Sequence, residues 1–233
     1  MLVDAHFHAD GLAAVLPGFA SEYRALGVLG LASAHTAANL ERGRSLMAGA
    51  GTCLFSFGIH PQLPVLDEAQ ALEAAALGGS IAAVGECGFD FYGDDNGMPR
   101  TPANEARQRE AFELQLDVAE RAALPLVIHL RAALDLAFAY AKRLARLKAV
   151  VFHSWPGPAN EALALLARGP GALFSFGGSV LNGNKKARAS AAALPESALL
   201  TETDAPFQSR ERRPARARAS CGPTPRRRTC ALP

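Results

Sequence analysis

The chain of 233 residues is 49% hydrophobic and 20% charged, a composition typical of one folded α/β domain and unlike that of a disordered or fibrous protein. No apolar run reaches the ~18 residues of a membrane span, and no signal peptide is recognisable at the start, so we expect a cytoplasmic protein. The four cysteines lie far apart, which excludes a disulfide framework and a Cys-x-x-Cys zinc site and predicts reduced thiols.

Short apolar segments alternate with stretches of helical composition, and this alternation predicts βα units around a parallel sheet. The candidate strands are Leu2–His6, Gly27–Ala34, Cys53–Ile59, Ile81–Cys87, Leu126–Leu130, Ala149–His153, Ala172–Phe176 and Ala198–Thr203. Helices are predicted over Glu68–Leu77, Glu105–Ala123 and Ala132–Arg146. In the second of these, Phe112, Leu116 and Ala119 are spaced for one buried face. Eight strands with intervening helices, in a chain near the ~250 residues of a typical barrel, predict an α/β fold of the (β/α)8 TIM-barrel type.

An open, doubly wound sheet is the structural alternative to this closed barrel. Such sheets bind nucleotides through a Gly-x-Gly-x-x-Gly or a Gly-x-x-x-x-Gly-Lys-Ser/Thr loop after a strand. No candidate strand is followed by either loop, so the barrel is the prediction for residues 1–208.

The last 25 residues, 209–233, differ in composition from the rest. Residues 210–233 hold eight arginines and one acid, so residues 1–209 carry a net charge of −5 although the whole chain carries +2. Four prolines and few large apolar side chains predict a disordered Arg/Pro-rich tail and a barrel that lacks the usual final helical layer. A shifted reading frame or an incomplete sequence would produce this composition, and an arm that binds phosphate backbones is the alternative interpretation of the arginines.

Histidines and acids recur where the candidate strands end. They are His6, His8, His60, Glu86, His129, His153 and Asp204, and among the six histidines only His35 falls outside this set. Most steps between them match one or two βα repeats of ~25–30 residues, and the exception contains an inserted loop at Phe91–Asn104. Because strand ends of a barrel converge on one face, these residues are expected to become neighbours. Imidazole and carboxylate groups together predict a site for zinc, manganese, iron or magnesium.

Two patterns within this set favour metal binding. In Asp-Ala-His-Phe-His at 4–8, strand alternation points His6 and His8 to the same face, as needed to hold one ion. Glu86 has glycines on both sides in Gly-Glu-Cys-Gly, and a carboxylate can bridge two ions where an imidazole cannot. A single histidine at a strand end is more often a hydrogen-bonded structural residue, and Asp204 before Ala-Pro is compatible with a turn cap. The repetition in phase with the strands is what favours a site.

Six motifs occur at these strand ends. They are Asp-Ala-His-Phe-His (4–8), Gly-Ile-His-Pro (58–61), Val-Gly-Glu-Cys-Gly-Phe-Asp-Phe-Tyr (84–92), Leu-Pro-Leu-Val-Ile-His-Leu-Arg (124–131), Phe-His-Ser-Trp-Pro-Gly (152–157) and Leu-Thr-Glu-Thr-Asp-Ala-Pro (200–206). In this order they resemble the TatD family of metal-dependent deoxyribonucleases, over residues 1 to about 208. The chain departs from the family pattern at Gln62, Ala132 and 154–157, positions that concern substrate contacts rather than the expected ligands.

The resemblance implies a hydrolase with two divalent ions, Mg²⁺, Mn²⁺ or Zn²⁺. The ligands that it implies are His6, His8, Glu86 and Asp204 for one ion, and Glu86, His129 and His153 for the other. Two such ions ~3.5–4 Å apart can activate a water molecule and stabilise the attacking and leaving oxygens at phosphorus.

Further catalytic roles are hypotheses that follow from this chemistry. Asp204 would take the proton from the water as a general base, beside Glu86, while His60 and Arg131 would contact a phosphate or the developing charge. Arg131 is equally compatible with a structural ion pair. The residues that open the inserted loop would line the pocket and stack a base: Asp90, Phe91 and Tyr92.

The favoured function is an exodeoxyribonuclease that acts on DNA from the 3′ end, with RNA as a further substrate and with no membrane contact or obligate protein partner. The first alternative is an amidohydrolase-like hydrolase of esters, lactones or D-aminoacyl-tRNA, because related barrels share the His-x-His start. Such enzymes commonly bridge two ions by a carbamylated lysine on the fourth strand, where this chain has Glu86. The second alternative is a truncated, inactive metal-binding barrel.

Overall fold

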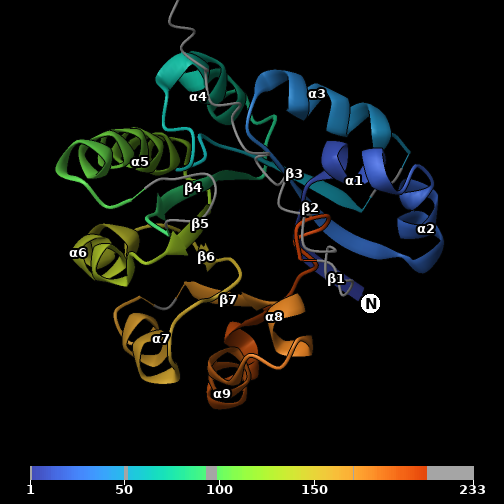
Figure 1. Cartoon of the computed structure of the whole chain (residues 1–233). Helices are drawn as coiled ribbons and strands as arrows, with labels where there is room; N and C mark the ends of the chain where they lie inside the picture. The colour runs from blue at the N-terminus through green and yellow to red at the C-terminus, as the bar shows by residue number, and fades with distance from the viewer. Residues whose placement is uncertain (1, 50–51, 93–98, 170, 209–233) are drawn as a thin grey trace, which may run out of the picture.

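In the computed structural model, which describes residues 2–49, 52–92, 99–169 and 171–208, eight parallel strands form one sheet in the order of the sequence (Figure 1). The strands are β1 (Leu2–Phe7), β2 (Val28–Ala34), β3 (Cys53–Phe57), β4 (Ala83–Asp90), β5 (Leu126–Arg131), β6 (Val150–Phe152), β7 (Ala172–Phe176) and β8 (Leu199–Thr201). This is the predicted (β/α)8 TIM barrel, and all eight candidate strands are confirmed.

The barrel closes where residues after β8 meet β1. The carboxylate of Asp4 accepts hydrogen bonds from the backbone N–H of Thr203 at 2.8 Å and from its hydroxyl at 2.7 Å. The backbone N–H of Asp204 donates to the carbonyl of His6 at 2.9 Å. We call this set of contacts the β1–β8 seam. It joins the first strand to the last described segment of the chain.

Helices lie around the outside of the sheet (Figure 1). They are α1 (Ala9–Val15), α2 (Phe19–Leu26), α3 (Ala37–Leu46), α4 (Ala69–Leu77), α5 (Pro102–Ala122), α6 (Leu134–Leu144), α7 (Ala159–Leu166), α8 (Gly178–Leu181) and α9 (Lys185–Ala193), with 3-10 turns at Leu66–Glu68 and Glu196–Ala198. The three predicted helices correspond to α4, α5 and α6. Within the described part of the chain no helix follows β8, and no helix is both long and apolar enough to cross a membrane.

The structure describes two of the four cysteines and none of the predicted Arg/Pro-rich tail. The Arg/Pro-rich tail and the last two cysteines, Cys221 and Cys230, lie outside the described residues. The other two cysteines, Cys53 and Cys87, are free thiols.

Small and branched apolar side chains fill the interior of the barrel. They form a layer that we call the apolar floor: Leu31, Ala83, Val127, Val151, Leu173 and Leu200. Because side chains alternate along a strand, residues two positions further on point into the barrel as well. These next residues are polar on most strands: Ser33, His129, His153, Ser175 and Glu202. A polar site is thereby positioned directly above an apolar layer, at the carboxyl ends of the strands.

The long helix α5 contributes both apolar and polar side chains to the interior. Phe112, Leu116 and Ala119 are at most 1% exposed, which confirms the predicted buried face. The Phe112 ring packs on Phe89 of β4, with centroids 4.8 Å apart. Among the described residues, α5 also buries two glutamines completely, and both hold backbone segments next to the polar site, as described below.

Candidate metal centre

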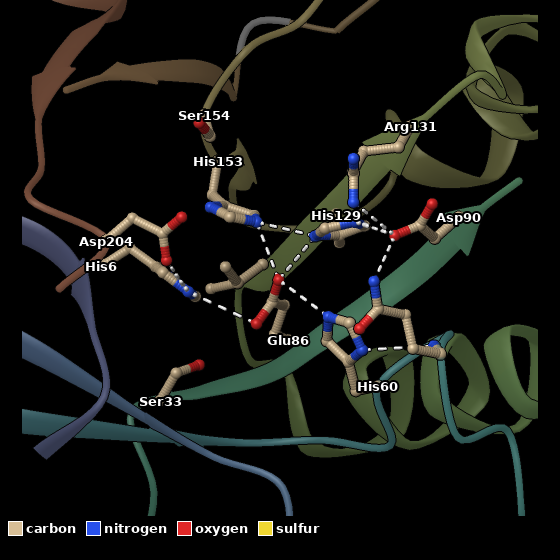
Figure 2. Close-up of polar contacts among 12 residues, drawn as sticks. His6, Ser33, His60, Glu86, Asp90, His129, Arg131, His153, Ser154 and Asp204 are labelled. Atoms are coloured by element: carbon tan, nitrogen blue, oxygen red, sulfur yellow. Dashed lines mark hydrogen bonds and ion pairs between the residues drawn. The ribbon is translucent and has the colours of Figure 1, made fainter. Parts of the chain in front are cut away.

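Eight side chains from seven of the strands, or from the residues that directly follow them, meet at the mouth of the barrel. We call them the ligand cluster: His6, His8, His35, His60, Glu86, His129, His153 and Asp204. Figure 2 shows most of them pointing toward one another around Glu86. The six ligands predicted from the sequence are all in the cluster, within reach of one another.

Glu86 lies at the centre of the ligand cluster and is 3% exposed. Its Oε1 atom lies 2.7 Å from His129 Nδ1 and 2.8 Å from His153 Nε2. Its Oε2 atom lies 3.4 Å from His6 Nε2 and 3.7 Å from His8 Nε2. The two carboxylate oxygens therefore face different imidazoles, an arrangement that suits a carboxylate between two cation positions, and Figure 2 shows His6 on one side of Glu86 and His129 and His153 on the other.

Asp204 completes the group on the His6 side. Its Oδ1 atom lies 3.8 Å from His6 Nε2 and 3.6 Å from His8 Nε2, while its Oδ2 atom accepts a hydrogen bond from Gln208 Nε2 at 2.9 Å. The backbone of Asp204 is left-handed, with φ of 50°, a conformation that costs a non-glycine residue ~1–2 kcal/mol. The hydrogen bond of its N–H within the β1–β8 seam and that of Oδ2 hold it in this conformation.

The donor atoms fit a divalent metal. The Nε2 atoms of His6 and His8 face each other at 3.2 Å, and so do His129 Nδ1 and His153 Nε2 at 3.1 Å. Two facing ring nitrogens can share only one proton, whereas converging lone pairs suit a cation between them. The ligand atoms in each of four groups of three lie within 4.8 Å of one another, and imidazole with carboxylate is a common ligand set for transition metals.

The electrostatics of the cluster also favour a cation beside Glu86. Burial alone would raise the pKa of Glu86, but His60, His153 and His6 hold that pKa well below its ordinary value. Burial would lower the pKa of His153, yet the carboxylates of Glu86 and Glu202 raise it well above the ordinary value. Positive charge is thus stabilised next to Glu86, whether a proton or a metal ion carries it.

His60 differs from the other imidazoles in its hydrogen bonding. Its Nδ1 atom accepts a hydrogen bond from the backbone N–H of Gln62 at 3.2 Å, so the proton of the neutral ring lies on Nε2. Nε2 lies 3.3 Å from Glu86 Oε1. Burial lowers the pKa of His60 to about 4, so the ring is neutral at pH 7. This geometry suits a hydrogen-bond donor at the mouth.

Asp90 anchors a network beside the cluster. Its Oδ2 atom lies 3.1 Å from His129 Nε2 and 3.4 Å from Arg131 Nη1, and accepts a hydrogen bond from Gln62 Nε2 at 2.8 Å (Figure 2). Burial would raise the pKa of Asp90, but hydrogen bonds with His129, the backbone of Tyr92 and Gln62 lower it to about 2. Asp90 is only 1% exposed, so its carboxylate does not face the mouth of the barrel but orients the side chains of His129 and Arg131.

The residues that open the inserted loop divide between core and surface. Phe91 is 6% exposed and belongs to the main hydrophobic core, so the expectation that it lines the pocket is wrong. Alternation along β4 and its continuation turns Phe91 away from the barrel axis, opposite to Asp90. Tyr92 is 57% exposed, and the guanidinium carbon of Arg131 lies 4.5 Å from its ring centre. Arg131 therefore makes both an ion pair with Asp90 and a stacking contact at the rim.

Sequence analysis missed His35. Its Nε2 atom lies 3.1 Å from Glu86 Oε2, its ring centre lies 5.1 Å from that of His8, and its side chain is 32% exposed. The signal that would have found it is period-two alternation, because His35 follows Leu31 and Ser33 on the inward face of β2.

Glu202 was missed as well. It lies two residues before Asp204, is buried, accepts a hydrogen bond from the Ser175 hydroxyl, and approaches His153 Nδ1 to 3.7 Å. Among the described residues, neither His153 Nδ1 nor Glu202 Oε1 has a hydrogen-bond partner. A carboxylate in this position fixes the orientation of a ligand histidine from outside the ligand shell.

The chain is similar in sequence and in fold to known proteins of one family. The sequence profile of the family described as TatD related DNase matches residues 3–225. The chain is 32% identical over 197 residues to the "3'-5' ssDNA/RNA exonuclease TatD" of Yersinia pseudotuberculosis, covering 78% of this chain and 69% of that protein. It is 32% identical over 167 residues to the protein of the same name from Cronobacter sakazakii, covering 66% of this chain and 58% of that relative, less than two thirds of its length. The crystal structure of the TatD homolog YjjV from Escherichia coli K12 superposes with a TM-score of 0.75 at 29% identity, covering 89% of this chain and 80% of YjjV.

Proposed function

Because the chain belongs to the TatD-related DNase family, we propose that it is a metal-dependent phosphodiesterase that shortens single-stranded DNA or RNA from the 3′ end. The names of the Yersinia and Cronobacter relatives describe this activity. The observation that supports the proposal best is the position of Glu86, whose two oxygens face different pairs of imidazoles at the mouth of the barrel.

Two divalent ions are part of the proposal. The residues that would hold them are His6, His8, Glu86 and Asp204 for the first, and Glu86, His129 and His153 for the second. When bound, Mg²⁺, Mn²⁺ or Zn²⁺ lowers the pKa of water and stabilises negative charge at phosphorus. Imidazoles outnumber carboxylates in the ligand cluster, which favours Zn²⁺ or Mn²⁺, because Mg²⁺ prefers oxygen ligands.

The protein's own groups would move protons and hold the phosphate. Burial opposes charge on Asp204, but His8 and His153 lower its pKa below the ordinary value, so its carboxylate is ionised and can accept a proton from the attacking water. His60, neutral and protonated on Nε2, would donate a hydrogen bond to a phosphate oxygen. Arg131, oriented by Asp90, would pair with the phosphate charge.

The experiment that tests this proposal measures cleavage of short single-stranded DNA and RNA labelled at either end. Metal-stripped protein is assayed alone and with Mg²⁺, Mn²⁺ or Zn²⁺ added. We expect stepwise, metal-dependent shortening from the 3′ end. Removing the central carboxylate in Glu86→Ala, or the proton acceptor in Asp204→Asn, should lower the rate by at least about 100-fold, the size of a general-base contribution.

The matched control is Glu196→Gln, which changes an exposed carboxylate outside the ligand cluster and should cleave like the unmodified chain. Metal content and thermal unfolding are measured on every variant to exclude misfolding. Bound metal without cleavage of DNA or RNA would overturn the proposal and direct the assay to esters, lactones and D-aminoacyl-tRNA. Absence of bound metal would indicate an inactive barrel.

A further inference from the structure

Two aromatic side chains, Tyr92 and Phe207, lie exposed at the mouth of the barrel. Tyr92 is 57% exposed and follows β4, while Phe207 is 69% exposed and follows β8. In a closed barrel with strands in sequence order, β4 and β8 are four strands apart in either direction. Tyr92 and Phe207 therefore stand on opposite sides of the mouth, with the ligand cluster between them.

Tyr92 is joined to the ligand cluster through the carboxylate of Asp90. Its backbone N–H donates to Asp90 Oδ1 at 3.0 Å, and Asp90 Oδ2 lies 3.1 Å from His129 Nε2. The Arg131 guanidinium covers one face of the ring with its carbon 4.5 Å from the ring centre. The ring is held in place by these contacts, and its remaining exposed surface is open to a planar ligand.

Phe207 is held on the other side by the turn that carries Asp204. Its backbone N–H donates to the Asp204 carbonyl at 2.8 Å. Its ring lies edge to face with His8, at 5.0 Å between centroids and an interplanar angle of 76°. An aromatic ring in contact with a candidate ligand histidine, yet more than two thirds exposed, is positioned for contact with whatever binds at the cluster.

The charge of the chain indicates that affinity for a nucleic acid comes from stacking on aromatic side chains rather than from ion pairs with the phosphates. Residues 1–209 carry a net charge of −5, so this part of the chain has no excess of positive charge with which to attract a polyanion. Stacking of bases on aromatic side chains does not depend on positive charge, and every base has a face that can stack.

From these observations, and resting on the proposed function, we propose that Tyr92 and Phe207 are stacking sites for nucleobases on the two sides of the phosphodiester bond that is cut. A base on Tyr92 would complete a sandwich with Arg131 beneath the ring. The bases of a duplex are stacked on each other and cannot offer their faces, so this site selects unpaired nucleotides. Selectivity for single strands then comes from the two rings.

The test compares a short single-stranded DNA with the same strand carrying abasic residues at its last positions. Both the specificity constant kcat/KM and binding by fluorescence anisotropy are measured for the unmodified chain, Tyr92→Leu and Phe207→Leu. Leucine keeps an apolar side chain and removes the ring. We expect the unmodified chain to prefer the base-bearing strand, and each leucine variant to lose about 5- to 100-fold of that preference.

Tyr92→Phe and Phe207→Trp keep a ring and should retain the preference. Leu181→Ala, which shortens an exposed apolar residue on α8, is the matched control. Equal use of base-bearing and abasic strands, or an unchanged preference in both leucine variants, would overturn the inference. Binding is measured independently of cleavage, so the two proposals can fail separately. Base-dependent binding without cleavage would refute the proposed function and support the stacking sites. Cleavage that does not depend on the bases would support the proposed function and refute the stacking sites.

Discussion

Gln115 holds both backbone polar groups of Ile59, the residue before His60. Its side-chain oxygen accepts a hydrogen bond from the Ile59 N–H at 2.7 Å, and its side-chain nitrogen donates to the Ile59 carbonyl at 3.1 Å. Seven residues earlier on α5, about two turns, Gln108 makes the same pair of bonds with Asp90, at 2.9 and 3.0 Å. One helix thus fixes the ends of β3 and β4 from outside the barrel.

Replacing Gln115 by leucine should destabilise the protein, because two buried backbone groups of Ile59 would lose their partners. At ~1–3 kcal/mol for each of the two unsatisfied groups, the free energy of unfolding should fall by about 2–6 kcal/mol, as measured by urea denaturation. Glu110→Gln, on the exposed side of the same helix, should change it by less than about 0.5 kcal/mol. A loss equal to that of the control would mean that the loop before His60 is held by other contacts.

Glu202→Gln should weaken metal binding without unfolding the barrel. The amide can still accept the hydrogen bond from Ser175, but it removes the negative charge beside His153. Loss of an outer partner of a ligand histidine typically costs about 10- to 100-fold in metal affinity. Calorimetric titration with Zn²⁺ or Mn²⁺ measures this change, with Glu196→Gln as the control that keeps the original affinity. Unchanged affinity in Glu202→Gln would show that His153 needs no such support.

His35→Ala should reduce the affinity or the number of bound ions, because it removes the imidazole nearest to Glu86 Oε2. We expect a loss of at least about 10-fold in affinity for Zn²⁺ or Mn²⁺, measured by the same titration. Thermal unfolding in the presence of a chelator should not change, since the side chain is one third exposed and fills little of the core. The same titration curve with and without His35 would contradict its assignment to the ligand cluster.

Gly88→Ala should prevent normal packing of β4 on β5. A Cβ atom at Gly88 would lie 2.2 Å from the carbonyl oxygen of His129, and the backbone φ of 130° suits only glycine. We expect a loss of at least about 3 kcal/mol in the free energy of unfolding, or no soluble protein. Gly79→Ala is the control for backbone strain without a steric clash. Gly79 has φ of 68° with open space around it, so the substitution should lower the free energy of unfolding by only about 1 kcal/mol. Equal losses in both variants would refute the steric argument.

The barrel and most of the ligand cluster were predictable because the strands are short apolar runs, most of them with a polar residue at or just beyond the end. Strands buried on both faces leave such runs in the sequence, and a barrel brings their ends together whatever lies between them. His60, Glu86, His129 and His153 all follow from this rule. His35 obeys it too, but a single histidine beyond the predicted strand end offered no motif to connect it with the others.

The features that escaped prediction depend on contacts between distant segments. β4 extends to Asp90, beyond the predicted Cys87, because Gly88 allows close approach to β5 rather than ending the strand. Gln108 and Gln115 lie within a predicted helix, but nothing in the sequence pattern marks them as buried, and only the fold gives them backbone partners. Helical periodicity distinguishes apolar from polar residues, but it does not identify the polar ones that are buried with matched hydrogen bonds.

Because it lies at the β1–β8 seam, the proposed first ion would have a second role: it would cross-link the two ends of the barrel. His6 and His8 belong to the opening of the chain and Asp204 to its last described turn, so an ion between them would cross-link a loop that contains nearly the whole barrel. Such a cross-link restricts the unfolded chain much as a disulfide does, and its effect grows with the length of the loop. Without the ion only the hydrogen bonds of the seam would hold the two ends of the barrel together, so metal supply would affect the stability of the fold as well as the rate of turnover.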